Sequence, residues 1–495
     1  MITYGKQTSR ARGRKGAIPF LLALLVTFAV AGCDFLDPTQ VENPLTTGDD
    51  LAQAEQPVQA LLPGLRAQFA RMVGSQIVIS EVVSDNYSVH GTGISGVWDD
   101  PRTIQPTDVN STSYVQGIYW NTQELRALAD FILDDIAPGD ETATNAQLAE
   151  AHYYRGMAYV TQGENFTYVP TEEDGTPRPA SELLQRGITN LQQTLSLNPG
   201  GDFELPARAG LARAYRALGD AAQATSHAGD VLGADGSFVF QQEFDPSSID
   251  NQPHIYLVVR ALKEMQPLPR LDFLDPKYLS RAAGIAVAKA EEMHLILAEA
   301  ALAAGQLGDA QQHLADAINL AISRGTVPYV DDDERLNGDL TVRPRSSQIL
   351  VRADPDSPFR AGLILDRPEV EIQVPTVSAT SLDADSVLAL TEAEDVWHAF
   401  HLARQEILFL EGRRMSDLGI RLPMMQREID QNPNIAEGAP GTSRVVPTYI
   451  PPTSQMNLFD PSTPYDADGN LVETEVTILH DLNRILATNQ VNAFN

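Results

Sequence analysis

The residues with the clearest potential for binding chemistry are aromatic and carboxylate or amide side chains in a turn-rich segment, 84–114, and in the helix expected after it. Aromatic rings offer flat apolar faces to the C–H side of sugar rings, and planar polar groups bond to hydroxyls. The candidate ligand contacts are Asn86, Tyr87, Trp98, Asp99 and Trp120. Trp98 and Tyr87 rank above Trp120, because Trp120 and Tyr119 begin a helix and are expected to face the core.

Catalytic and metal-binding motifs are not recognisable, so we predict no catalytic residue, no cofactor and no metal site. The motifs G-x-S-x-G, P-loop and H-E-x-x-H are absent. His398 and His401 lack a third ligand nearby and are expected to be ordinary helix-face histidines. Residues 331–334 depart from the calcium-loop pattern, and 466–470 predict a turn. With 66 acidic residues, counting alone does not exclude a glycosidase pair, so a surface glycoside hydrolase stays an alternative.

Cys33, the only cysteine, offers a thiol that could carry lipid. Five basic residues precede the apolar run Ile18–Val30, which is too short to cross a bilayer and leads into Val30-Ala31-Gly32-Cys33. This order is typical of a bacterial lipoprotein signal. We therefore predict a signal peptide at 1–32, acylation of Cys33, with palmitate among the acyl groups, and a polar tether at 33–50. An ordinary signal peptide with an incidental cysteine is the alternative.

The charge and composition of the chain restrict its partners. The formal net charge is −31, and removing residues 1–32, with five basic residues and no acidic ones, takes it to −36. Such a surface repels nucleic acid, so we exclude DNA and RNA as partners. The hydrophobic fraction of 43% is that of a folded globule. A single cysteine leaves no internal disulfide, so burial must stabilise the fold.

Helices must position these residues, and most of them are expected in pairs. Apolar spacing predicts helices at 51–73, 119–136, 149–163, 183–197 and 477–488, and helical hairpins at 205–232 and 286–324. The hairpins turn at Gly219 and at Gly305–Gly308, and small residues at their crossings are typical of tetratricopeptide units. Insertions rich in Pro, Asp and Gly at 169–179 and 233–275 make the repeat irregular.

The predicted fold is therefore mainly α. Irregular tetratricopeptide-like hairpins span 145–325, and a loop-rich C-terminal part, 326–495, contains a strand at 370–374 and a long helix at 387–418. Together they form a single body over 51–495. Binding is expected on the long loop insertions, because loops held by a rigid scaffold commonly carry binding residues.

Charged residues inside the helix expected at 387–418 have the spacing of a partly buried ion network. Arg404 and Glu411 are seven residues apart and would share a face, while Arg414 is three residues from both Glu411 and Asp417. Gly412 would let another backbone approach closely. We assign Arg404, Glu411, Gly412, Arg414 and Asp417 a structural role, so Arg414→Ala should damage folding before binding. Trp397 is expected in the core.

The stretch Arg404–Leu418 resembles the E-G-x-R-x-x-D-L signature of the SusD/RagB family of nutrient-uptake lipoproteins. Three further stretches are similar to motifs of that family and follow the family's order: Cys33–Asp37, Glu292–Ala300 and Ile450–Asn457, which are similar to C-x-x-F-L-D, E-M-x-L-I-x-A-E-A and I-P-x-x-E. There are departures. Gln455 replaces the usual Glu, Met415 replaces a frequent aromatic, and the basic residue after the signature is delayed to Arg421.

The resemblance implies a SusD-like fold and a non-catalytic lipoprotein, exposed at the cell surface on the outer membrane. Such proteins capture oligosaccharide, or in some members peptide, for import through a partner TonB-dependent, SusC-like transporter. In some bacteria an Asp directly after the acylated cysteine retains a lipoprotein at the inner membrane, and Asp34 holds that position here. The expectation of an outer-membrane location therefore depends on the resemblance. A tetratricopeptide adaptor lipoprotein in envelope assembly is the alternative from another class. It would explain the hairpins and the lipid, but not the signature.

Overall fold

Helices that pack as sequential neighbours make up most of the computed structural model, which describes residues 55–89, 96–109, 117–259, 265–330, 344–367, 370–451 and 456–494. Residues Gln56–Asn495 form one compact unit. The predicted signal peptide, Cys33, the tether and the acidic run 331–334 lie outside the described residues. Among the described residues, no helix combines the length and the apolar character that crossing a membrane requires.

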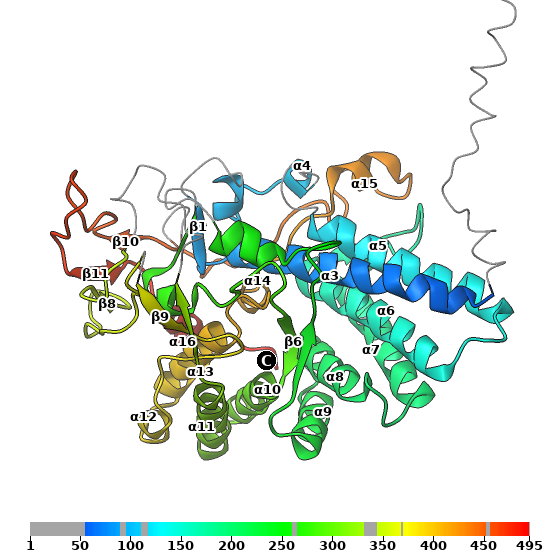
Figure 1. The fold of residues 1–495 in the computed structure, drawn as a ribbon. Helices are drawn as coiled ribbons and strands as arrows, with labels where there is room; N and C mark the ends of the chain where they lie inside the picture. The colour runs from blue at the N-terminus through cyan, green and yellow to red at the C-terminus, as the bar shows by residue number, and fades with distance from the viewer. Residues whose placement is uncertain are drawn as a thin grey trace, which may run out of the picture. The chain divides into compact units, whose positions relative to one another are not determined.

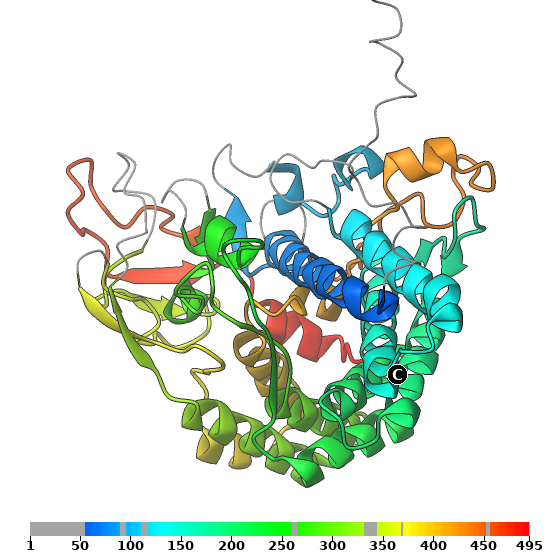
Figure 2. The same cartoon turned by 45° about the vertical axis from the view of Figure 1, so that its right-hand side comes forward.

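The main helices follow the predicted order, with some shifted ends. They are α3 (Pro57–Val83), α5 (Ile118–Asp130), α6 (Asn145–Asn165), α7 (Ala180–Leu197), α8 (Glu204–Leu218), α9 (Ala221–Ala234), α10 (Ala290–Ala303) and α11 (Leu307–Ser323). Shorter or later helices are α4 (Pro106–Val109), α12 (Ala384–Leu388), α13 (Ala393–Ile407), α14 (Arg414–Asp417), α15 (Gln426–Gln431) and α16 (Leu482–Thr488). Figures 1 and 2 show α5 to α11 in one curved row, with α3 and α16 on its inner side. The prediction of a mainly α fold with tetratricopeptide-like hairpins is confirmed.

The predicted turn at Gly219 shows how the hairpins are closed. Gly219 ends α8 with φ of 80°, a left-handed conformation that costs glycine little. The backbone N–H of Asp220 donates to Tyr215 O at 3.0 Å, and the Asp220 side chain then caps α9 by accepting from Gln223 N at 3.1 Å. One glycine and one aspartate therefore end the first helix and begin the second.

Short strands lie in the insertions and in the C-terminal part. They form four antiparallel pairs: β1 (Tyr87–Val89) with β5 (Met265–Pro267), β2 (Tyr168–Val169) with β3 (Arg178–Pro179), β4 (Val239–Gln242) with β6 (Ile285–Lys289), and β7 (Val327–Val330) with β9 (Glu371–Val374). In the remaining sheet, β11 (Glu475–Ile478) pairs antiparallel with β10 (Phe459–Asp460) and parallel with β8 (Leu350–Arg352). Two predictions are corrected here. Residues 286–289 and 477–478 were predicted to be helical, but they are strands, because each pairs with a segment distant in sequence.

The long helix predicted at 387–418 is wrong. The chain forms α12, then α13, which ends at Ile407, and resumes helical structure only at α14. Between α13 and α14, Leu410 and Gly412 have φ of 59° and 73°, which end a right-handed helix. A Cβ on Gly412 would lie 3.2 Å from Gln76 Cγ of α3. The space beside Gly412 is therefore filled by side chains of α3 and not by the backbone that was predicted to approach there. The signature therefore spans a bend rather than one helix face.

Candidate functional site

A hollow with a volume of about 420 Å³ opens between the start of α5, the loop of the β2–β3 hairpin and α15. Its size is in the usual range for small-ligand pockets. In Figures 1 and 2, α15 and α5 lie on the same side of the molecule. The residues that line it include Tyr119, Trp120, Gln123 and Glu124 of α5, Glu172, Glu173 and Asp174 of the loop, and Arg427, Glu428 and Gln431 of α15.

Hydrogen bonds between distant segments hold the walls of this hollow. The Gln123 side chain donates to Pro170 O at 2.9 Å and so ties α5 to the loop. On the other side, Asn432 Nδ2 donates to Gly175 O at 2.9 Å, and Asn434 Nδ2 donates to Asp174 O at 2.6 Å. The predicted insertion at 169–179 therefore forms one fixed wall of the hollow.

Trp120 is the aromatic surface of the hollow. Its residue is 38% exposed, whereas Tyr119 is buried against Phe166 with ring centroids 5.4 Å apart. Adjacent residues on a helix are about 100° apart, so one faces the core and the next faces outward. The Arg427 guanidinium lies 5.9 Å from the Trp120 ring centroid, which is within cation–π range. The expectation that Trp120 faces the core is wrong, and that for Tyr119 is correct.

A second hollow, of about 780 Å³, adjoins the first and shares Arg126 and Glu172 with it. Its lining is mostly charged. Arg126 Nη1 lies 2.5 Å from Asp130 Oδ2, and Arg155 Nη1 lies 3.2 Å from Asp130 Oδ1. Burial raises the pKa of Asp130, and the guanidinium groups of Arg126 and Arg155 oppose that effect. The two hollows together make a polar groove. Among the described residues that line it, the aromatic ones are Tyr119, Trp120 and Tyr159, and Trp120 is the most exposed of the three.

The remaining predicted ligand contacts are placed elsewhere. Tyr87 is fully buried, stacks on Phe409 with centroids 5.7 Å apart and donates to Asp275 Oδ1 at 2.6 Å. Asn86 is buried as well, and its side chain bonds Glu81 and Gln405. The ligand predictions for Tyr87 and Asn86 are therefore corrected, because a side chain enclosed in the core presents no surface to a sugar.

Trp98 and Asp99 lie in a short 3₁₀ turn, Gly96–Asp99, that packs against the core. Trp98 is 6% exposed, so its ranking as the first ligand contact is wrong. Asp99 is half-buried and accepts a bond from Asn457 Nδ2 at 2.9 Å. Asn457 Nδ2 also donates to Tyr87 O at 2.9 Å, so the end of the Ile450–Asn457 stretch helps to hold this turn. A ligand contact of Asp99 stays a prediction.

The charged signature residues form buried ion pairs, with distant elements for Glu411 and Arg414 and within the signature for Arg404 and Asp417. Glu411 Oε1 lies 2.6 Å from Lys277 Nζ and 2.5 Å from Lys289 Nζ. Arg414 makes a two-bond contact with Asp85, with N–O distances of 2.6 and 2.9 Å. Arg404 Nε lies 2.7 Å from Asp417 Oδ2. The predicted ion network therefore exists, but the pairing predicted at three-residue spacing along one helix is wrong.

Burial and pairing act in opposite directions on the pKa values of this network. Burial lowers the pKa of Lys277 to about 8, although the Glu411 carboxylate favours its charged form. Burial would raise the pKa of Asp417, but the guanidinium groups of Arg404 and Arg216 hold it below its usual value. His401 is buried, and its pKa falls to about 3 because of burial and nearby arginines. His398 Nε2 lies 2.7 Å from Asp481 Oδ2. His401 instead stacks on Trp397 with ring centroids 5.8 Å apart, and its buried Nε2 has no hydrogen-bond partner among the described residues.

Sequence reasoning missed two groups of residues. Arg427 and Glu428 lie in α15, a six-residue helix too short to show apolar periodicity. His294 and His313 lie on α10 and α11, 19 positions apart, and only the hairpin brings them together. The spacing of His313 and Asp316, which puts both on one helix face, was the available signal. The turn predicted at 466–470 is confirmed, since Asp466 Oδ1 accepts from Asn470 N at 2.8 Å.

The hairpin row, the long insertions and the groove define a mainly helical protein of the tetratricopeptide-like class with a surface pocket. The chain is similar in structure to SusD superfamily proteins from Bacteroides fragilis (13% identity, TM-score 0.50, 77% of this chain and 99% of that one) and Parabacteroides distasonis (11%, 0.51, 76% and 98%). It is also similar to a provisionally named sugar binding protein from Bacteroides vulgatus (14%, 0.50, 77% and 97%). No family model and no curated protein sequence matches the chain. The chain thus has the fold of the SusD superfamily, as its motifs predict.

Proposed function

We propose that this protein is a SusD/RagB family lipoprotein that captures oligosaccharide in the groove beside Trp120 and releases it to a TonB-dependent transporter of the outer membrane. The shared fold and the four motifs in family order support the family. The name of the similar Bacteroides vulgatus protein supports a sugar as ligand. Its role is binding without catalysis, and incubation with polysaccharides should release no reducing ends.

The observation that carries the proposal is an exposed indole in a hollow lined by polar side chains. Trp120 offers an apolar face for a sugar ring, while Gln123, Glu124 and Glu428 around it offer planar groups to hydroxyls. The adjoining second hollow gives room for further sugar units, so the groove suits an oligosaccharide better than a monosaccharide.

Replacing Trp120 by Ala is expected to weaken oligosaccharide binding at least tenfold, or about 1.4 kcal/mol, because aromatic side chains commonly carry much of the binding energy. Titration calorimetry with the best ligand from a glycan panel would measure this. Trp120→Phe is the matched control and should retain part of the affinity. Unchanged binding by a folded Trp120→Ala variant would contradict the proposed site.

The acidic lining of the groove favours a second candidate, the capture of basic peptides. Among the described residues that line the first hollow, Glu124, Glu172, Glu173, Asp174 and Glu428 are acidic, whereas Arg126 and Arg427 are basic. Such a balance attracts cations. Basic peptides in the same titration separate the two ligands: tight, salt-sensitive peptide binding without glycan binding would replace the oligosaccharide.

The proposed membrane anchor is acylated Cys33, for which the motif at 30–33 is the support. Intact-protein mass spectrometry should find acyl groups on a chain that begins at Cys33, and Cys33→Ser should move the protein to the soluble fraction. After gentle detergent extraction, the native protein is expected to co-purify with a large β-barrel transporter. Recovery of the anchored protein alone would contradict the partnership while leaving the ligand proposal standing.

A further inference from the structure

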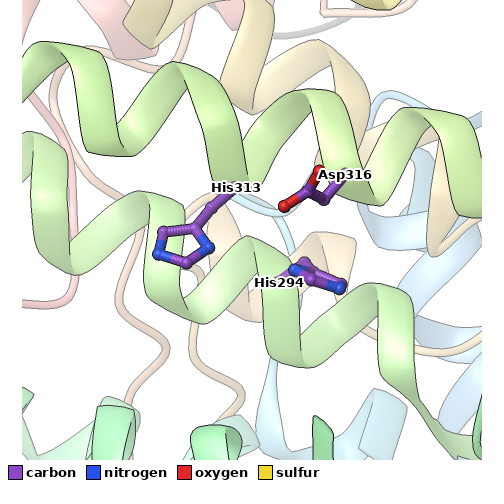
Figure 3. A group of neighbouring side chains, drawn as sticks. All are labelled: His294, His313 and Asp316. Atoms are coloured by element: carbon purple, nitrogen blue, oxygen red, sulfur yellow. The ribbon is translucent and has the colours of Figure 1, made fainter. Parts of the chain in front are cut away.

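Three side chains with metal-binding atoms converge between the helices of the α10–α11 hairpin. His294 lies on α10, and His313 and Asp316 lie on α11, one turn apart. One ligand atom from each residue lies within 4.8 Å of the other two. Figure 3 shows both imidazole rings and the carboxylate turned toward the space between the two helices. The three residues are half-buried.

One ring nitrogen of each histidine in this cluster has no hydrogen-bond partner among the described residues. Nδ1 of His294 and Nδ1 of His313 are both buried and make no hydrogen bond within the described part of the chain. The two ring centroids are 6.2 Å apart with an interplanar angle of 40°, so the rings do not stack face to face. Buried nitrogens without a partner are unfavourable, and two of them beside a carboxylate form an arrangement that a cation would stabilise.

The donor set selects a class of ion. Two imidazoles and one carboxylate are ligands typical of Zn²⁺ and neighbouring transition metals, whereas Ca²⁺ requires six to eight oxygens. In a tetrahedral zinc site with metal–ligand distances of ~2.0–2.2 Å, ligand atoms lie about 3.4 Å apart. Small side-chain rotations would therefore close the site.

We propose that His294, His313 and Asp316 bind a divalent transition-metal ion, with Zn²⁺ as the expected occupant, and that the ion links α10 to α11. Three protein ligands leave a fourth position for water or for a ligand from solvent. The strongly acidic chain raises the local concentration of cations. The site lies on a hairpin remote in sequence from the residues of the groove, so the proposal is independent of the oligosaccharide proposal.

Calorimetric titration of the full chain, stripped with a chelator, with ZnCl₂ tests the proposal. We expect one ion per chain and a rise in Tm that the chelator reverses. His313→Gln and Asp316→Asn should each weaken binding at least tenfold. The matched control is His227→Gln, because His227 of α9 also has a buried Nδ1 without a hydrogen-bond partner, yet it belongs to no such cluster, both judged over the residues that the structure describes. Its zinc affinity should equal that of the wild type.

Co²⁺ provides a second measurement that does not depend on stability. Co²⁺ added to the stripped protein should give the visible absorption of a tetrahedral site, and Zn²⁺ should displace it. His294→Gln should abolish this absorption while the far-ultraviolet dichroism of the variant stays that of the wild type. Absence of binding by the wild type would overturn the proposal. Equal binding by the wild type and by folded His313→Gln and Asp316→Asn variants would show adventitious binding and would overturn it too.

Discussion

Replacing Glu411 by Gln is expected to lower the free energy of unfolding by about 3–5 kcal/mol, the usual cost of removing one partner from a buried ion pair. Glu411 Oε1 is the carboxylate atom nearest to both Lys277 Nζ and Lys289 Nζ, and both ammonium groups are almost wholly enclosed. Backbone carbonyls of Phe409 and Ile407 accept from the two lysines, but they carry no full charge. Both buried lysines would lose the carboxylate that pairs with them.

The pH dependence of this variant provides an internal check. Lys277 already has a pKa of about 8, against 10.5 when unperturbed, and loss of Glu411 should lower it further. The unfolded chain then binds more protons than the folded one, so the stability of the variant rises with pH. The deficit relative to the wild type should shrink as the pH rises toward about 8, where Lys277 of the folded wild type loses its proton as well. Between about 8 and 10.5 the stabilities of both proteins should rise in parallel. Denaturant unfolding at several pH values measures it, and exposed Glu437→Gln should change stability by less than about 0.5 kcal/mol.

The second large effect is expected for Arg414→Ala, also about 3–5 kcal/mol. The guanidinium makes two bonds to Asp85 and donates to Asn483 Oδ1 at 2.9 Å, and all three residues are buried. Its loss would leave the Asp85 carboxylate with Gln405 as a neutral donor at 3.0 Å and with Arg270 at 3.8 Å. The pair joins the bend at α14 to the end of α3, so the damage should reach both.

Arg427→Ala is the matched control for Arg414→Ala, since Arg427 is exposed and lines the groove. It should leave stability within about 0.5 kcal/mol of the wild type, while ligand affinity changes. Arg414→Ala should lower stability but leave ligand affinity unchanged, under conditions in which the variant remains folded. The double variant Asp85→Ala/Arg414→Ala should be less destabilised than the sum of the single variants, because the orphaned carboxylate is removed. Additive losses would show that the two side chains act separately.

Predictions from the sequence succeeded where the signal was local. The hairpin α8–α9 was recognisable because its apolar stripe, the glycine at the turn and the aspartate that caps the second helix are all within about thirty residues. The same holds for α10 and α11. The prediction of a long helix at 387–418 failed, because the apolar and charged residues of this stretch follow a helical pattern. The bend that interrupts it depends on contacts with α3 and with Lys277 and Lys289.

The groove was only partly predictable for the same reason. Aromatic residues in a glycine-rich segment suggested exposure, but Tyr87 pairs with β5 through its backbone and packs on Phe409, more than 300 residues away in sequence. Trp120 begins a helix whose inner face is already filled by Tyr119 and Phe166, and so faces solvent. Both outcomes depend on contacts with residues distant in sequence: Phe409 for Tyr87, and Phe166 for the face of α5 that Tyr119 occupies.

The sequence by itself determined that this chain forms paired helices, carries long insertions and places a structural charge network near its C-terminus, because helix periodicity, turn residues and charge spacing act over short distances along the chain. Tertiary structure alone decided which aromatic ring is exposed, which cation meets each buried carboxylate, and that two histidines and an aspartate converge on one hairpin. Burial and ion pairing depend on distances in space, and residues far apart in the chain set those distances only once the helices are packed.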